Sequence, residues 1–244
     1  MAHTTRVFDP SDYTYAQTEL SLVLDPVTKI QQFPFHDETI VIDLGSAVTP
    51  DKNTGKMKAA YAIFFGPGSP YNTATLLPEN LPQNAQPATL HAALKTLHQI
   101  PTINLSSHPP NQNPNPSPDP NSNPSPNKKT LIILKTGQTR GPDFHDHITS
   151  TCWEWEANNW ERLPNPYRDG KRAGARALKK REMGEGEMGE EEEEGNKVKF
   201  AAQYRELHEL CEGKLKEGIV VQFWKVERGE NGLVDGMAKR VLRG

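Results

Sequence analysis

Two amide side chains, Asn84 and Gln86, stand directly before a short amphipathic stretch of the chain. An amide both donates and accepts hydrogen bonds, so this pair can cap the start of a helix or bind a ligand that approaches it. The stretch that follows repeats apolar residues at helical spacing: Leu90, Ala93, Leu94 and Leu97. The pattern predicts a helix over 89–97 with the two amides at its entrance, and both roles stay open for them.

Three strands are expected before and around this point. Residues 39–44 are rich in β-branched side chains, and the Gly-Ser pair that follows them predicts a turn. Residues 59–65 are apolar throughout and run into Gly-Pro-Gly-Ser-Pro, which predicts a buried strand that ends in a turn. Residues 73–77 supply the third strand. Together they predict an antiparallel meander that leads into the helix.

The second half of the chain alternates strands with helices. Residues 130–135 form the apolar run of a strand buried on both faces, and residues 219–226 predict another strand. Apolar residues at helical spacing predict helices over 204–215 and 234–242. Parallel strands need helical crossovers. We therefore predict an α/β fold with a five-stranded mixed sheet flanked by helices, its first strand central between the second and the fourth.

Two segments are too polar to join a core. Residues 106–129 are almost entirely Asn, Pro and Ser, and residues 164–196 carry a basic run followed by an acidic run. Such segments bury too little apolar surface to offset the entropy of ordering, so both are predicted to be disordered loops. We expect a leader, residues 1–36, that packs on the domain or stays mobile, and one domain, residues 37–243, interrupted by these loops.

Composition narrows the class of protein. The net charge of −3 provides no overall field for nucleic acid, so such binding must use a local patch. Two cysteines, Cys152 and Cys211, are too few for a disulfide framework. No stretch has the length of a membrane span or the pattern of a secretory signal. We expect an intracellular protein, nuclear or cytoplasmic, that is not secreted and has no membrane partner.

Three parts of the chain resemble type 1 ribonuclease H. Residues 59–66, Ala-Ala-Tyr-Ala-Ile-Phe-Phe-Gly, and the amides before the helix are similar to the family's Gly-Tyr-Gly-x-Phe-Phe-Gly strand and Gln-x-x-Gln-Arg-Ala-Glu-Leu helix start. Trp153, Trp155 and Trp160 match the spacing of three tryptophans common in this family. Residues 221–235 resemble its C-terminal Val-x-Phe-x-His-Val-x-(Arg/Gly)-x-Glu-Asn-x-x-x-Asp. The resemblance implies the ribonuclease H-like fold.

It also implies a chemistry. Enzymes of this family cut the RNA strand of an RNA–DNA hybrid with two Mg²⁺ ions held by clustered carboxylates. The resemblance assigns the four acid positions to Leu44, Thr89, Gly137 and Asp235, and the position of a mobile histidine to Lys225. Asp235 is the one acid among the four, and it also suits a helix N-terminus, where the dipole favours a negative charge.

Asp43 is a second acid near the first of these positions. It precedes Leu44 by one residue, and a one-residue shift along a strand turns a side chain to the opposite face of the sheet. Asp43 therefore serves as a metal ligand only if a β-bulge turns it back toward the site.

Our interpretation is a ribonuclease H-like protein of the RNA–DNA hybrid class that has lost hydrolysis, in which Asn84 and Gln86 contact ribose hydroxyls and base edges. One alternative is an active Mg²⁺-dependent hybrid nuclease whose acids are rebuilt from Asp43, Asp143 or Asp146, and Asp235. The other is a non-catalytic protein-interaction module that reaches a protein partner through the two polar insertions.

Overall fold

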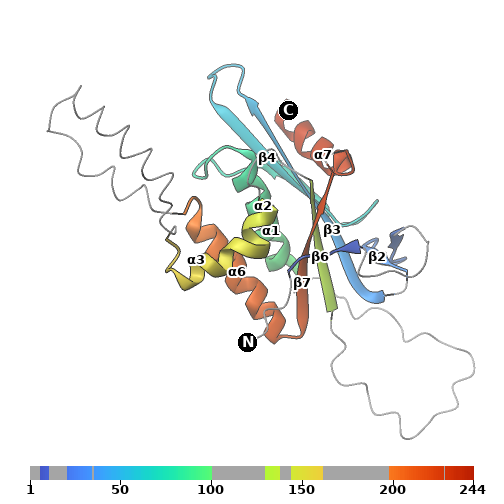
Figure 1. Cartoon of the computed structure of the whole chain (residues 1–244). Helices are drawn as coiled ribbons and strands as arrows, with labels where there is room; N and C mark the ends of the chain where they lie inside the picture. Colours follow the sequence, from blue (N-terminus) through green and yellow to red (C-terminus); the bar gives the residue numbers. More distant parts are fainter. Residues whose placement is uncertain are drawn as a thin grey trace, which may run out of the picture.

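A mixed β-sheet with helices on both faces makes up the part of the chain that the computed structural model describes, residues 6–10, 21–34, 36–100, 130–137, 144–161, 198–227 and 229–244 (Figure 1). The strands are β1 (Val23–Leu24), β2 (Gln31–Phe33), β3 (His36–Pro50), β4 (Met57–Phe64), β5 (Thr73–Leu76), β6 (Thr130–Gly137) and β7 (Ile219–Val226). The helices are α1 (Ala85–Gln99), α2 (Phe144–Asp146), the π-helix η4 (His147–Thr151), α3 (Cys152–Ala157), α6 (Ala201–Lys216) and α7 (Gly232–Arg243). Both predicted polar insertions lie outside the described residues.

The five predicted strands pair as expected. Strand β3 is central, antiparallel to β4 on one side and parallel to β6 on the other. Strand β5 continues the meander from β4, and β7 runs parallel to β6. Helices lie between the parallel strands along the chain, as the connection of parallel strands requires. The predicted α/β fold class, a mixed sheet with the first predicted strand central and helices on its faces, is confirmed in the topology that the resemblance to ribonuclease H implies.

Two short strands from the leader extend the sheet. Strand β2 pairs with the first part of β3, which β4 leaves open, since Gln31 lies opposite Val41 while β4 pairs from Asp43 onward. Strand β1 pairs with β2, and Val7 forms a bridge to Phe223 in β7. The described part of the leader therefore packs on the domain. Strands this short, between prolines, have too few residues for a periodic pattern to predict them.

The two faces of β3 serve different layers, because successive side chains of a strand point to opposite faces. Ile40, Ile42 and Leu44 belong to the main core with α1 and α6. Val41 lies in a smaller cluster with Phe8 and Phe33, and Ala47 lies under Val234 and Ala238 of α7. Figure 1 shows α1, α3 and α6 on one side of the sheet and α7 on the other.

The turn predicted after residue 44 was wrong. Strand β3 continues through Gly45 and Ser46 to Pro50, and the hairpin turns at residues 51–56. Asp51 holds that turn by accepting hydrogen bonds from the amides of Asn53 and Thr54 at 2.9 and 2.8 Å. A glycine inside a strand marks the close approach of another backbone, and here α7 makes that approach over Gly45.

The helices differ from prediction mainly at their ends. Helix α1 begins at Ala85 rather than at residue 89, because Pro87 falls in its first turn, where a missing N–H costs nothing. The tryptophan-rich stretch, for which no element was predicted, forms η4 and α3. Among the described helices, none is both long and apolar enough to cross a membrane.

Candidate functional site

The site positions meet where β3 and β6 run side by side and where α1 and α7 begin. Leu44 of β3 lies opposite Thr136 of β6 in the parallel register, and Gly137 ends β6. Leu44 and Thr89 are both buried, with exposed fractions of 1% and 7%. The structure thus brings the four positions implied by the resemblance to one place, although three of the four side chains carry no charge.

Asp235, the remaining acid, is held by hydrogen bonds within the chain. Its Oδ1 accepts a hydrogen bond from the backbone N–H of Ser46 at 3.3 Å and from the side-chain amide of Asn231 at 3.3 Å. Asn231 is itself buried and also donates to the carbonyl oxygen of Leu44 at 2.9 Å. The carboxylate therefore ties the start of α7 to the middle of β3, as a helix N-terminal acid does.

Thr89 stands where the family has a glutamate. Its hydroxyl donates to the backbone carbonyl of Ala85 or to the hydroxyl of Ser46, with both oxygens at 3.1 Å. Ser46 therefore links Thr89 on one side of β3 to Asp235 at the start of α7. The hydroxyls of Thr89 and Ser46 are neutral, so this pair adds no negative charge to the site.

Gly137 leaves little room for a side chain. A Cβ atom there would lie 3.0 Å from the Cβ and 3.2 Å from the amide nitrogen of Asn231. The amide of Asn231 thus takes the space into which a carboxylate at position 137 would have to fit.

Asp43 faces away from Leu44, on the opposite side of the sheet. Lys135 Nζ lies 3.4 Å from its Oδ1 as an ion pair, and Gln31 donates to its Oδ2 at 3.3 Å. Burial raises the pKa of this carboxyl, and Lys135 opposes the rise. The register of β3 with β6 runs without interruption from Thr39 to Leu44, and its register with β4 is regular from Asp43 onward. The bulge that would turn Asp43 toward Leu44 is therefore absent from these two pairings.

Lys225, at the position of the family histidine, forms an ion pair with Asp146 at 3.2 Å. It shares the sheet face of Leu44 and Thr136, since the three residues lie opposite one another across the parallel strands. Asp143 lies outside the described residues. Within the described residues, no three His, Cys, Asp or Glu side chains gather closely enough to hold a metal ion.

The two amides at the start of α1 have different surroundings. Gln86 donates to the hydroxyl of Tyr204 at 2.8 Å, and its Nε2 lies 3.0 Å from Nδ1 of His147. Asn84 is exposed, and its side chain makes no capping hydrogen bond to α1. The capping role considered for this pair is therefore filled by neither side chain: Gln86 joins α1 to α6 and η4, while Asn84 faces solvent.

The three tryptophans of the matched stretch pack rather than line a binding face. Trp155 and Trp160 are buried in the main core. Trp153 is half-buried, with the guanidinium of Arg6 at 4.3 Å from its ring centre. The sequence did not point to three further residues that contact the site: Tyr204, His147 and Ser46. They contact Gln86 and Thr89 only in the folded chain, where distant segments lie side by side. The Glu-Asn pair of the C-terminal motif could have pointed to Asn231.

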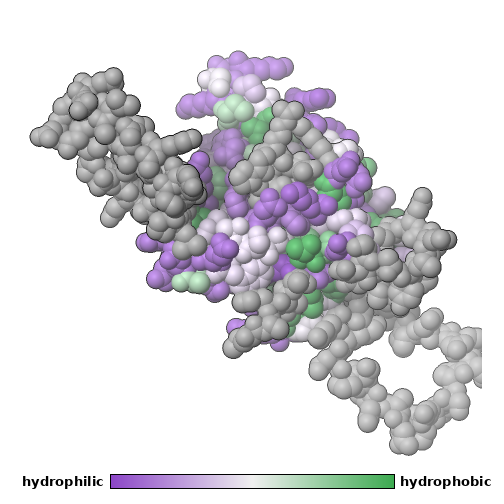
Figure 2. Space-filling model, in the orientation of Figure 1, coloured by the Kyte–Doolittle hydropathy of each residue, from purple (hydrophilic) through white to green (hydrophobic). Residues whose placement is uncertain are grey.

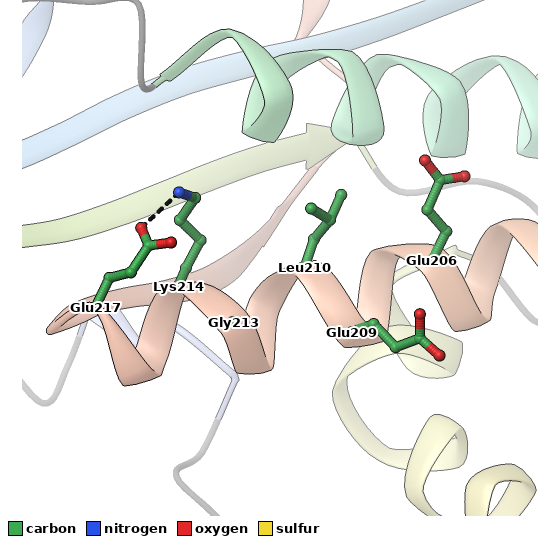
Figure 3. A pocket seen from close by; sticks show the side chains of 6 residues that line it. All are labelled: Glu206, Glu209, Leu210, Gly213, Lys214 and Glu217. Atoms are coloured by element: carbon green, nitrogen blue, oxygen red, sulfur yellow. Dashed lines mark hydrogen bonds and ion pairs between the residues drawn. The ribbon is translucent and has the colours of Figure 1, made fainter.

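A shallow groove on α6 lies apart from these residues. It encloses about 260 Å³ and is lined by Glu206, Glu209, Leu210, Gly213, Lys214 and Glu217 (Figure 3). Lys214 is taken up by an ion pair with Glu217 at 2.6 Å. Three of the six residues that line the groove are glutamates, and carboxylates repel phosphate groups.

Comparison with known proteins gives similarity at the level of the fold. No family model matches the chain, and no curated protein matches its sequence. Among solved structures, a foamy viral protease–reverse transcriptase in complex with an RNA/DNA hybrid is 11% identical with a TM-score of 0.46, over 94% of this chain and 23% of the viral one. LC9-RNase H1, a type 1 RNase H with the type 2 active-site motif, is 9% identical with a TM-score of 0.44, over 84% and 70%.

RNase H1 from the halophilic archaeon Halobacterium salinarum NRC-1 is 11% identical with a TM-score of 0.35, over 84% of this chain and 98% of the archaeal one. This chain spans less than a quarter of the length of the foamy viral chain. Similarity as weak as this concerns the fold alone.

Proposed function

We propose that this protein is a non-catalytic ribonuclease H-like protein that binds nucleic acid of the RNA–DNA hybrid class. The observation that carries the loss of catalysis is the state of Asp235. Oδ1 of its carboxylate accepts hydrogen bonds from Ser46 and Asn231, while the residues at the other three acid positions are neutral.

The residues present do not fit a pair of Mg²⁺ ions. Two hard dications close together need several fixed carboxylate oxygens to replace their water ligands and to offset their mutual repulsion. The described site offers the single carboxylate of Asp235, the hydroxyls of Ser46 and Thr89, and the apolar side chain of Leu44. No hydrolytic step is therefore assigned to this site.

Nucleic-acid binding is supported by the start of α1. Asn84 is exposed and its side chain makes no capping hydrogen bond to α1, and an amide can bond to a 2′-hydroxyl and to a base edge at once. Gln86 supports this position indirectly, since its bond to Tyr204 fixes the first turn of α1 against α6. In this proposal Asn84 contacts the RNA strand and Gln86 positions the helix.

The two alternative functions have less support. A rebuilt nuclease would draw on Asp43 and on Asp143 or Asp146. Asp43 and Asp146 each face a lysine, Lys135 and Lys225 respectively, and Asp143 lies outside the described residues. A protein-interaction role through the insertions rests on residues outside the described part of the chain, so no contact favours it.

The loss of catalysis is tested with a labelled RNA–DNA hybrid and Mg²⁺. We expect cleavage at background for the unchanged chain, and Asp235→Asn should leave it there. Robust Mg²⁺-dependent cleavage that Asp235→Asn abolishes would overturn the non-catalytic assignment and establish a nuclease.

The binding assignment is tested by comparing an RNA–DNA hybrid with a DNA duplex of the same sequence. Asn84→Ala should weaken hybrid binding by about five- to tenfold, the value of one or two hydrogen bonds, and leave duplex DNA unaffected. Gln203→Ala, which removes an amide from α6, serves as the control. Equal affinity of the unchanged chain for both ligands would contradict recognition of the RNA strand.

A further inference from the structure

One end of the molecule gathers exposed cationic side chains from two elements that are distant in sequence. The β3–β4 hairpin contributes Lys52, Lys56 and Lys58, and the last two turns of α7 contribute Lys239, Arg240 and Arg243. All six residues are exposed. We call these six residues the basic end.

The fold places the two contributions at the same end. Helix α7 lies along β3 and β4, with Val234 and Ala238 packed on Ala47, Ala60 and Ala62. It starts over Gly45 and runs toward the hairpin turn, so that the C-terminus lies beside the upper end of the hairpin (Figure 1). The small alanine side chains let the helix lie close to the strands, which fixes the cations on a rigid support.

Few carboxylates offset these charges. Lys58 forms an ion pair with Asp51, and Glu79 acts on Lys58 from farther away. No ion pair joins the other five cations to a carboxylate among the described residues. The helix dipole explains a preference for cations in the last turn of α7, but it does not explain the lysines of the hairpin.

The opposite charge collects elsewhere. Helices α3 and α6, with the residues that directly follow each of them, carry seven glutamates: Glu154, Glu156, Glu161, Glu206, Glu209, Glu212 and Glu217. Helix α6 also carries Arg205, Lys214 and Lys216, so the glutamates outnumber the cations on these elements, while the chain as a whole has a net charge of only −3. Such a separation of charge orients an approaching polyanion toward the basic end.

We propose that the basic end binds the phosphodiester backbone of duplex nucleic acid without reading its sequence. This deepens the proposed function and rests on it. Duplex nucleic acid presents about one phosphate per 1.7 Å of its axis, which suits several cations spread over two elements. The hairpin turn, residues 51–56, is polar throughout, and Figure 2 shows hydrophilic side chains projecting at this end. A protein partner would need an apolar centre that this turn does not offer.

The test removes charge from the basic end without reversing it. The variant carries Lys52→Gln, Lys56→Gln, Arg240→Gln and Arg243→Gln, which leaves the Asp51–Lys58 pair in place. Its matched control carries Lys29→Gln, Lys95→Gln, Lys199→Gln and Lys216→Gln, four exposed cations on other surfaces, so both variants have the same net charge. Affinity for a labelled RNA–DNA hybrid and for a DNA duplex is measured between about 50 and about 200 mM salt.

We expect the basic-end variant to bind both ligands at least about tenfold more weakly, with a salt slope reduced by roughly 0.9 for each phosphate that the protein no longer neutralises. The control variant should change by less than about threefold. Equal weakening in the two variants, or none in either, would overturn the basic end as the phosphate-binding surface. Stronger binding of poly-glutamate than of either duplex would assign it to an acidic protein instead.

The outcomes separate this inference from the proposed function. If the unchanged chain binds hybrid and duplex equally and only the basic-end variant loses affinity, recognition of RNA by Asn84 fails and the basic end stands. If Asn84→Ala reduces hybrid binding and the basic-end variant does not, the proposed function stands and this inference fails. No binding of either ligand by the unchanged chain would overturn both.

Discussion

The backbone of Gly45 in β3 lies directly against the backbone of Val234 in the first turn of α7. A Cβ atom at position 45 would lie 2.7 Å from the carbonyl carbon of Val234 and 2.8 Å from the amide nitrogen of Asp235. This approach brings the carboxylate of Asp235 within reach of the amide of Ser46. The size of the residue at position 45 therefore limits how closely α7, with Asp235, can pack against β3.

Gly45→Ala should force α7 away from β3. We expect a loss of about 1–3 kcal/mol in the free energy of unfolding, the usual cost of overpacking, measured by urea denaturation. Gly236→Ala is the control in the same helix, because nothing lies within 4 Å of a Cβ atom there. That change should stabilise the protein by up to about 1 kcal/mol, since alanine favours a helix over glycine. Similar effects of both variants would contradict the close approach.

Restoring the first acid position should cost stability rather than recover activity. Leu44 is 1% exposed within the main core, so Leu44→Asp removes apolar packing and buries a carboxylate without a cation. We expect a loss of about 3–5 kcal/mol, judged from large-to-small core changes. Leu44→Met, which keeps the volume, should cost less than about 1.5 kcal/mol. Thermal unfolding of the two variants checks this, and equal midpoints would contradict it.

Local patterns were enough to predict the sheet. Two signals, the apolar runs of β4 and β6 and the β-branched start of β3, are local. They predict strands without any knowledge of the rest of the chain. The end of β3 could not be predicted, because Gly45 resembles a turn residue until α7 is seen to lie on it. Strands β1 and β2 depend on the open edge of β3, which exists only in the folded sheet.

The site was predictable in position and not in its contacts. The positions could be found by aligning the chain with the motifs of a family, which needs only the order and spacing of residues: Leu44, Thr89, Gly137 and Asp235. The hydroxyl pair of Ser46 and Thr89 joins residues 43 positions apart and has no sequence signature. The difference between the exposed Asn84 and the engaged Gln86 likewise depends on Tyr204, which the distant helix α6 supplies.

Both thiols should be unreactive in the folded protein. Burial raises the pKa of Cys152 and of Cys211 to about 12, so almost no thiolate forms at about pH 8. We expect labelling by a disulfide-exchange reagent to be at least about a hundredfold slower than in unfolded chain, with the rate set by opening of the core. The absorbance of the released thiolate measures this. Rapid labelling of one thiol under native conditions would place that cysteine at the surface.

Arg6 in the N-terminal segment contacts His208 of α6. Arg6 is buried, and its Nη1 lies 2.9 Å from Nδ1 of His208, while its Nη2 pairs with Glu212 at 2.7 Å. An arginine only donates hydrogen bonds, so Nδ1 must be the acceptor and the imidazole proton resides on Nε2. That nitrogen faces Glu156 at 3.2 Å. Protonation of Nδ1 would therefore replace the bond to Arg6 with repulsion.

Stability should depend on pH through this contact. Burial, with the positive charge of Arg6, lowers the pKa of His208 below the 6.5 of an ordinary histidine, although Glu156 and Glu212 oppose the shift. The unfolded chain then binds the proton more readily than the folded one. The stability contributed by neutral His208 is fully present above about pH 6.5. It is lost as the pH falls toward the folded-state pKa, and no further change occurs below that pKa. His91, whose pKa burial also lowers, adds a decline in the same range.

His208→Asn separates the two histidines. It removes the titrating group and retains an acceptor for Arg6, so the free energy of unfolding should be lower at neutral pH but should fall less between about pH 6.5 and 5 than in the unchanged chain. His91→Asn should leave most of the decline in place, because the His91 ring packs against the ring of Tyr61 rather than against a buried cation. Urea denaturation at a series of pH values measures both. An undiminished decline in His208→Asn would show that the Arg6 contact is not the source of the pH dependence.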